Sequence, residues 1–573
     1  MSNRSRNTVN KLLLLLSAIP AAASALNTTV TLTADGTITP TASEIVTFGL
    51  PLAEGDVYNL NDIRVLIDGV EQMISIEAGL TWHWSDSSLR SVTIQLRNAD
   101  MTDGDVKVSI TDAGNAAPTR SFLPHHDGWA TGPADKANMP FPRVFAVHDL
   151  DYLASTGIIP PYTPGTSGEG VGQLQSEQFD NGFGDLDFSV NGAGSQASYL
   201  FDRATAMMKA YMATGEIKFL KEGFMTKQLY FSHIRDDGAS PARTGGEGCF
   251  TFGSVNCRDG KYIYTEPAKL AWALLGDNSQ WDNSLIDNMA FQADLGDYQA
   301  STRDLYDSES ELFTERAAGL VGLAELAAYE ITGNPRVLAH LNERIDSLKD
   351  MQQVEKSWEK ENGWIPKSGA FTHSWCRHEG CASGYPGDGT TDDRRFSPWM
   401  SENIADFLWQ AYNITGRSDI PEMLRLLGNA IDLYGFTSSY LSGVGLSSTY
   451  QNKNGLNTIT LSCSAADPAP TSMLYSGSAF ASAEALSETA LAYTDQHNVE
   501  VILPLALAFY FETNSDSRTR LYSRIKHLER QWLSNTPEDC SRLTRPPRVF
   551  NWQHRSNSVR TWNWVLTEFS GDY

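Results

Sequence analysis

The sequence predicts a protein of two parts. An N-terminal β-sandwich or β-barrel domain, residues 26–122, is followed by a ring of paired helices, an (α/α) toroid, over residues 196–573. Two observations predict this division: apolar and polar residues alternate in the first part, and a helix-closing phrase recurs in the second. The segment between them, residues 123–195, is rich in Pro, Gly and Asp, so we expect a connector there.

The N-terminal part has the period-two pattern of half-buried strands. The alternation is clearest in residues 63–67, 92–97 and 106–110, and turns containing Asp, Gly or Asn separate these runs. Several short strands with turn signals between them are typical of an all-β sandwich or barrel.

The helical part repeats the phrase Ala-Tyr-x-x-Thr-Gly. It occurs at residues 210–215, 328–333 and 411–416, with looser copies at 271–276 and 508–513. Each copy closes an apolar stretch, and the glycine stands where a helix stop needs a left-handed residue. Helical hairpins cannot bury their apolar faces alone and must stack. The copies lie roughly 55 to 100 residues apart, which is too irregular for a regular solenoid and favours a closed ring with long loops.

The first 25 residues have the pattern of a secretory signal peptide. Three basic residues precede the apolar run 12–16, and residues 23–25 read Ala-Ser-Ala, a small-x-small cleavage site. The run is too short to span a bilayer, and no other stretch of about 18 apolar residues follows. We therefore expect a secreted or periplasmic protein without a membrane partner.

The charge of the chain excludes some partners. Asp and Glu number 69 against 44 Lys and Arg, giving a net charge of −25. Such a field argues against nucleic acid and against an anionic membrane surface. An acidic polysaccharide stays open as a partner, because arginines can gather in a cleft while acidic residues solvate the outside. We expect a monomer.

The six cysteines form an even set in a chain with a secretory signal, which predicts disulfides. Six cysteines allow 15 connectivities. Pairing nearest neighbours would join Cys249 to Cys257 and Cys376 to Cys381, and would leave the long-range pair 463–540. Metal binding would need tighter Cys and His spacing.

Two phrases in the β domain carry a resemblance to a known family. Residues 48–55 read Phe-Gly-Leu-Pro-Leu-Ala-Glu-Gly, and residues 82–90 read Trp-His-Trp-Ser-Asp-Ser-Ser-Leu-Arg. They resemble the N-terminal domain of secreted exo-acting rhamnogalacturonan lyases, although Ser87 replaces a glycine of the family phrase. Residues 314–316 and 397–400 resemble the toroids of several polysaccharide lyases. The resemblance implies a polysaccharide lyase that cleaves a uronic-acid-containing polymer, such as ulvan or rhamnogalacturonan, by β-elimination.

A lyase must neutralise the uronate carboxylate, remove the α-proton and protonate the leaving oxygen. The loop from His373 to Tyr385 holds the densest collection of suitable groups. We expect His378 or His373 to be the base and Tyr385 the proton donor, with Trp375 and Arg377 contacting substrate.

Further substrate contacts are expected from arginines and aromatic residues near helix starts and the C-terminus. A guanidinium can hold a carboxylate through two hydrogen bonds, which lysine cannot do. Arg394 has the alternative of pairing with a neighbouring aspartate, and Thr314 beside Arg316 is a candidate N-cap. The expected contacts are Arg316, Arg394, Trp399, His554 and Arg555.

Two other functions remain open. Glycoside hydrolysis needs two carboxylates about 5 to 9.5 Å apart, and Glu315, Asp392, Asp393 and Glu402 are available. A non-catalytic carbohydrate-binding or cell-surface protein is the second alternative. The sequence lacks the motifs of nucleotide, serine-hydrolase and zinc-protease sites. We expect no required cofactor and no catalytic metal, while a structural divalent cation could sit in a loop such as 180–182.

Overall fold

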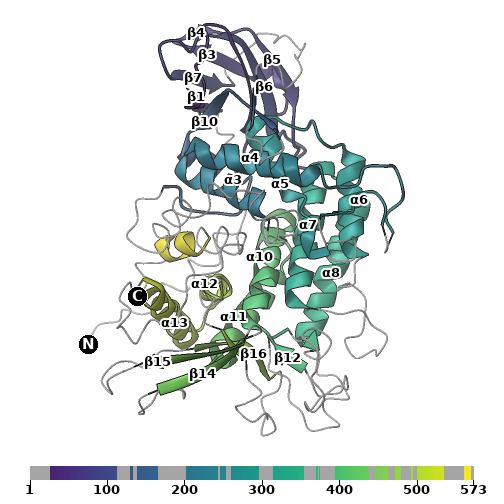
Figure 1. Cartoon of the computed structure of the whole chain (residues 1–573), viewed down its shortest axis with the longest axis vertical. Helices are drawn as coiled ribbons and strands as arrows, with labels where there is room; N and C mark the ends of the chain where they lie inside the picture. The colour runs from purple at the N-terminus through teal and green to yellow at the C-terminus, as the bar shows by residue number, and fades with distance from the viewer. Residues whose placement is uncertain are drawn as a thin grey trace, which may run out of the picture.

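The computed structural model places an antiparallel β region first and a helical region after it, as the sequence predicts (Figure 1). The β region lies at one end of the molecule, and a second group of strands lies at the opposite end, beyond the helices. The structure describes residues 26–112, 129–132, 138–165, 202–242, 245–252, 260–295, 314–353, 369–371, 373–374, 394–437, 446–452, 455–461, 472–478, 492–494, 500–533 and 561–568.

The β region consists of two antiparallel sheets that share one apolar core. The first has the order β10-β1-β7-β3-β4 and the second β2-β6-β5. Alternate residues of the strands, such as Val30, Leu32 and Ile94, are buried between them. The strands are β1 (Asn27–Ala34), β2 (Glu44–Pro51), β3 (Arg64–Ile67), β4 (Val70–Glu71), β5 (Ile74–Ala78), β6 (Ser91–Ala99), β7 (Val106–Thr111) and β10 (Val144–His148).

The segment expected to be a connector contributes to this region. Strand β10 pairs with β1, with His148 opposite Val30, and helix α1 (Leu150–Ser155) follows directly. The Val-Phe-Ala-Val-His run is rich in β-branched and aromatic residues and is buried at every position except Val147, and it forms a strand despite the Pro and Gly around it. A short ribbon of β8 (Ala130–Thr131) and β9 (Pro140–Phe141) lies just before it.

The helical region is built from consecutive helix pairs. The first helix of a pair is buried almost all round, and the second is more exposed. None of the described helices is long and apolar enough to cross a membrane. The pairs are α3 (Arg203–Thr214) with α4 (Ile217–Phe231), α5 (Glu266–Leu275) with α6 (Asn283–Asp294), α7 (Glu315–Thr332) with α8 (Pro335–Gln353), α10 (Pro398–Thr415) with α11 (Ile420–Tyr434), and α12 (Ile502–Phe511) with α13 (Ser515–Leu533).

The repeated phrase ends these first helices as predicted. Gly215, Gly276, Gly333 and Gly416 are their C-caps, all left-handed with φ between 62° and 73°. A side chain is strained there, so glycine fits the stop. The loosest copy differs, because α12 ends at Glu512 in an extended conformation.

Helices α7 and α10 lie side by side and run in the same direction. A Cβ at Gly319 would lie 2.3 Å from the backbone of Asn403, and one at Gly322 would lie 2.8 Å from the ring of Phe407. The two glycines therefore permit a close approach of the helices. Both N-terminal ends lie at the same end of this pair.

The β region packs on the opposite, C-terminal ends of the first helices. A Cβ at Gly333, the C-cap of α7, would lie 2.7 Å from the ring of His83, and one at Gly276 would lie 2.5 Å from Thr93. The tight turns demanded by the repeated phrase thus form the surface that receives the β region. The long connections between pairs leave from the other end.

The 82–90 phrase forms the centre of this joint. Arg90 is fully buried, and its guanidinium lies 4.6 Å from the ring centroid of Trp82 and 4.8 Å from that of Trp84. The guanidinium also forms an ion pair with Glu330 of α7 at 2.7 Å. The phrase used for the family resemblance therefore ties the two regions together.

Short strands accompany the long connections. Strand β12 pairs with β11 and β16, and β14 pairs with β15 in a hairpin. They lie at the far end of the helices from the β region (Figure 1). Their bounds are β11 (His373–Ser374), β12 (Arg394–Phe396), β13 (Phe436–Thr437), β14 (Leu446–Asn452), β15 (Gly455–Leu461), β16 (Ser472–Ser478) and β17 (Ala492–Thr494).

Cys249 is buried and disulfide-bonded. The other five cysteines, including its predicted partner Cys257, lie outside the described residues. The predicted pairings therefore stay predictions.

Candidate functional site

Two of the residues expected to form the site, Arg316 and Trp399, have described side chains. For His373 and Arg394 the structure describes the backbone, in strands β11 and β12. The other expected site residues lie outside the described part of the chain: Trp375, Arg377, His378, Tyr385, His554 and Arg555, together with the hydrolase candidates Asp392 and Asp393 and the loop 180–182.

Arg316 and Trp399 come together where α7 and α10 begin. Thr314 is the N-cap of α7, as expected, and its hydroxyl accepts the N–H of Ala317 at 3.2 Å. Arg316 follows in the first turn, with its guanidinium carbon 5.7 Å from the ring centroid of Trp399. Trp399 is only 3% exposed, and the guanidinium makes a cation–π contact with its ring.

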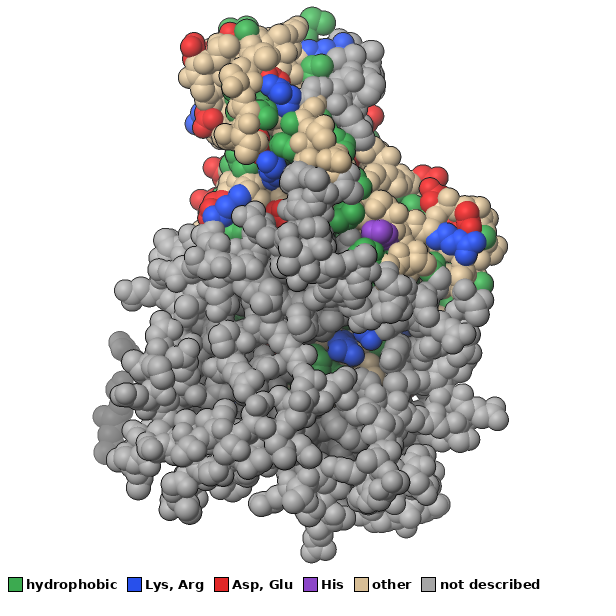
Figure 2. Space-filling view, in the orientation of Figure 1, with side chains coloured by type: hydrophobic (Ala, Val, Ile, Leu, Met, Phe, Trp, Pro, Cys, Tyr) green, Lys and Arg blue, Asp and Glu red, His purple; other side chains and the backbone are tan. Residues whose placement is uncertain are grey.

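The guanidinium of Arg316 has no carboxylate partner in the described part of the chain. Its Nε is buried without a hydrogen-bond acceptor there. The protein has 25 more acidic than basic residues, yet Arg316 lies over the Trp399 ring and forms no ion pair with a described carboxylate. Such a guanidinium is suited to bind an anionic ligand. In Figure 2, Lys or Arg side chains are visible beside hydrophobic ones in a hollow over the middle of the helical region.

Two short strands flank the predicted catalytic loop, and the second of them leads to the start of α10. Strands β11 and β12 pair with His373 opposite Arg395 and Ser374 opposite Arg394. Paired strands lie about 4.8 Å apart, so the segment 375–393 leaves and returns at neighbouring points. Strand β12 leads directly into α10, whose first turn carries Trp399. The described residues on either side of the segment that contains His378 and Tyr385 therefore lie near the start of α10, where Arg316 contacts Trp399.

A chain of buried charges lies deeper in the helical region. It alternates in sign and links the β region to α7, α5 and α3 through residues that are nearly unexposed. The successive pairs are Arg90–Glu330 at 2.7 Å, Glu330–Lys269 at 2.8 Å, Lys269–Glu266 at 3.5 Å and Glu266–Lys209 at 2.9 Å.

The motifs of the sequence do not single out these residues, although a signal for them is present. Lys209 and Lys269 stand inside apolar helical stretches, Met-Met-Lys-Ala-Tyr and Ala-Lys-Leu-Ala-Trp. A lysine is rarely fully buried unless it is paired. A lone lysine within an apolar helix therefore indicates a buried acidic partner.

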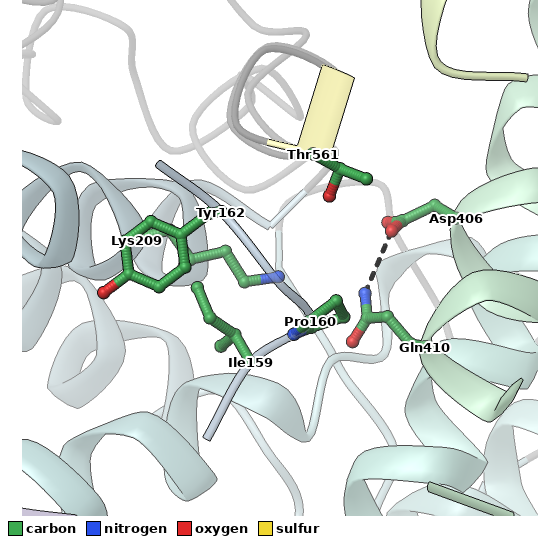
Figure 3. A pocket seen from close by; sticks show the side chains of 7 residues that line it. All are labelled: Ile159, Pro160, Tyr162, Lys209, Asp406, Gln410 and Thr561. Atoms are coloured by element: carbon green, nitrogen blue, oxygen red, sulfur yellow. Dashed lines mark hydrogen bonds between the residues drawn. The ribbon is translucent and has the colours of Figure 1, made fainter. Parts of the chain in front are cut away.

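A small cavity lies between α3 and α10, next to Lys209, the last residue of this series of ion pairs. Lys209 reaches toward it from one side, Asp406 and Gln410 from the other, and Thr561 from the C-terminal helix, residues 561–568 (Figure 3). Gln410 donates from Nε2 to the Asp406 carboxylate at 3.1 Å. The cavity of about 10 Å³ has room for about one water molecule.

Burial alters the protonation of the acidic groups here. It raises the pKa of Asp406 to about 7, with Lys209 opposing the rise and Glu402 adding to it. Burial likewise raises the pKa of Asp202 to about 7, although Asp202 caps α3 through the N–H of Thr205. Protons on these two carboxyls reduce the negative charge that the interior must hold.

Asp406 should make the stability of the protein depend on pH. The folded state keeps the Asp406 proton up to about pH 7, whereas an unfolded aspartate loses it near 3.8. Between these values the folded state binds more protons, so stability falls as pH rises from about 4 to 7. In urea unfolding at pH 5 to 8, Asp406→Asn should show a smaller fall than the wild type. The exposed control Asp100→Asn should keep the wild-type fall, and an equal fall in both variants would contradict the assignment.

Asp294, Glu325 and His340 form a cluster whose ligand atoms lie within 4.8 Å of one another. Arg344, fully buried, already supplies a positive charge there. Its Nη2 donates to Asp294 at 2.7 Å and its Nε to Glu325 at 2.8 Å. Both carboxylates are thereby compensated, so the cluster is an ion-pair network and supports no metal assignment.

Comparison of the chain with models of protein families and with curated proteins finds no match. The site is therefore interpreted from its own chemistry. A guanidinium supported by a tryptophan, at paired helix starts and beside the base of a long loop, can hold an anionic group. The buried charges link α7, α5 and α3.

Proposed function

We propose that this protein is a polysaccharide lyase that cleaves a uronic-acid-containing polysaccharide, such as ulvan or rhamnogalacturonan, by β-elimination. The observation that carries the proposal is the guanidinium of Arg316, supported on Trp399 and without a described carboxylate partner. Two parallel N–H donors match the two oxygens of a uronate. Holding the carboxylate in this way stabilises the enolate-like charge that develops when the α-proton leaves.

In the proposed reaction, the base removes the proton on the carbon next to the carboxylate. The electron pair forms a double bond to the neighbouring carbon, and the glycosidic C–O bond breaks. The leaving oxygen takes a proton from the acid. His378 or His373 is proposed as the base and Tyr385 as the acid. The proposed further substrate contacts are Trp375, Arg377, Arg394, His554 and Arg555.

The helix pairs are proposed to close into an (α/α) toroid around this site. Buried ion pairs join α3 to α5 and α5 to α7, so these three helices are neighbours. The close packing of α7 on α10 adds α10 to this series. The cavity supports closure, because α3, α10 and the C-terminal helix all line it. We propose a secreted or periplasmic monomer that acts on an acidic polysaccharide and requires no cofactor.

Glycoside hydrolysis is the second candidate, favoured by one observation. Asp406 has a pKa raised to about 7, as a general acid needs, and Glu402 lies one turn away on the same helix. Asp406 is 4% exposed and faces a cavity with room for about one water molecule. A sugar does not fit that space, so hydrolysis ranks second.

The products decide between the two reactions. Purified protein should be incubated with ulvan, rhamnogalacturonan, alginate, glucuronan and glycosaminoglycans, and both ultraviolet absorbance and reducing ends should be followed. Elimination leaves a double bond conjugated to the carboxylate, so we expect both signals to rise together on one of these polymers. Reducing ends without the absorbance would establish hydrolysis. No change on any polymer would overturn both proposals.

A further inference from the structure

We propose that Glu315 is a positioning residue for this site: it fixes the start of α7 against the start of α10 and so holds Arg316 in register with the base of the 375–393 loop. The inference rests on the proposed function. It adds a residue that touches no substrate but sets the distance between the carboxylate-binding arginine and the loop expected to carry base and acid.

The contact that carries the inference joins two helices and a strand. Glu315 is the first residue of α7 and is 0% exposed. Its Oε1 accepts the backbone N–H of Ser397 at 3.2 Å. Ser397 is the N-cap of α10, lies directly after β12, and makes no side-chain capping bond of its own. The Glu315 carboxylate of α7 therefore binds the backbone at Ser397, between β12 and α10.

The rest of the α7–α10 contact lies further along the two helices. They approach closely at Gly319 and Gly322, and the ring of Phe407 of α10 lies against Gly322. The helix starts add directional contacts to this packing: Glu315 accepts the N–H of Ser397, and the adjacent Arg316 lies over Trp399.

A small shift at this point has a large expected effect. Shortening the side chain by one carbon withdraws its oxygens by about 1.5 Å. Either the hydrogen bond to Ser397 is lost or α10 moves toward α7. A misplacement of about 1 Å in a catalytic arrangement can cost about 10²-fold in rate.

Two conservative variants separate position from charge. Glu315→Asp keeps the charge but shortens the reach, whereas Glu315→Gln keeps the reach and the acceptor oxygen but removes the charge. On the polymer cleaved by the wild type, we expect E315D to lower kcat by about tenfold or more with little change in KM, and E315Q to stay within about twofold. Thermal melting should confirm that both variants are folded.

A double-mutant cycle with Arg316→Ala tests whether Glu315 affects kcat through Arg316. If Glu315 acts through Arg316, then E315D should add little to the loss already caused by R316A. Full additivity, an E315D enzyme with wild-type kcat, or an E315Q enzyme as impaired as E315D would each overturn the inference while leaving the proposed function standing. A wild-type protein that forms no unsaturated product would overturn the proposed function and, with it, this inference.

Discussion

Replacing Arg316 with alanine is expected to lower kcat/KM on the uronate polymer by about 10²- to 10³-fold, the usual effect of removing a group that stabilises transition-state charge. The substrate carboxylate would lose its bidentate partner at the moment when negative charge spreads onto it. Arg316→Lys should lose most of this activity too, because an ammonium cannot make two parallel hydrogen bonds. Steady-state kinetics, followed by the ultraviolet absorbance of the unsaturated product, provide the measurement.

The chain offers a matched control for this variant. Arg336, at the start of α8, also lies over an aromatic ring, 5.0 Å from the centroid of Phe291, but it is exposed and away from the α7–α10 start. Arg336→Ala should keep wild-type activity. Because Arg316 forms no ion pair with a described residue, its removal leaves none of the described buried acids unpaired and should not unfold the protein. If R316A and R336A have equal activity, Arg316 does not bind the carboxylate.

Arg90→Met should destabilise the protein by about 3–5 kcal/mol, the usual cost of removing one partner from a buried ion pair. Arg90 and Glu330 are 0% and 3% exposed in their side chains, and water cannot replace the lost contact. Methionine fills part of the space between Trp82 and Trp84, so the main effect comes from the buried Glu330 carboxylate, which loses one of its two cationic partners and keeps only Lys269. Urea unfolding of the full chain at constant pH measures the change.

The exposed pair Arg64–Glu71 provides the control for burial. Arg64→Met should leave the unfolding midpoint unchanged, because solvent screens an exposed pair. Adding Glu330→Gln to Arg90→Met should recover part of the loss, since the carboxylate that lost Arg90 is then neutral and Lys269 keeps Glu266 as a partner. An Arg90→Met protein as stable as Arg64→Met would show that the joint between the two regions does not depend on this pair.

The order of the two regions could be predicted because it depends on local patterns. Alternation along residues 92–97 is sufficient to indicate a strand, and a glycine after Ala-Tyr-x-x-Thr is sufficient to indicate a helix stop. The role of Gly333 as a helix C-cap therefore follows from the local sequence alone, and the structure confirms it. The short strands β11 to β17 were not anticipated, because their pairing joins segments far apart in sequence.

The site was predictable to a smaller extent. Arg316 and Thr314 stand out because helix starts have a local signature, and the structure confirms Thr314 as the cap. The sequence suggested that Trp399 contacts substrate, whereas its described contact is with Arg316. The pairing of Arg90 with Glu330 joins residues 240 positions apart, and no local pattern encodes such a distance.

The alternating chain from Arg90 to Lys209 also limits how this sequence can evolve. Reversing or neutralising any one link places like charges side by side, or leaves a charge unpaired, in a medium that does not screen it. A lineage can therefore leave this arrangement only by changing several links together, for instance to apolar residues of similar volume. Single charge changes that are tolerated on the surface should be removed by selection at these buried positions. Related sequences should therefore keep all of these buried ion pairs or none of them.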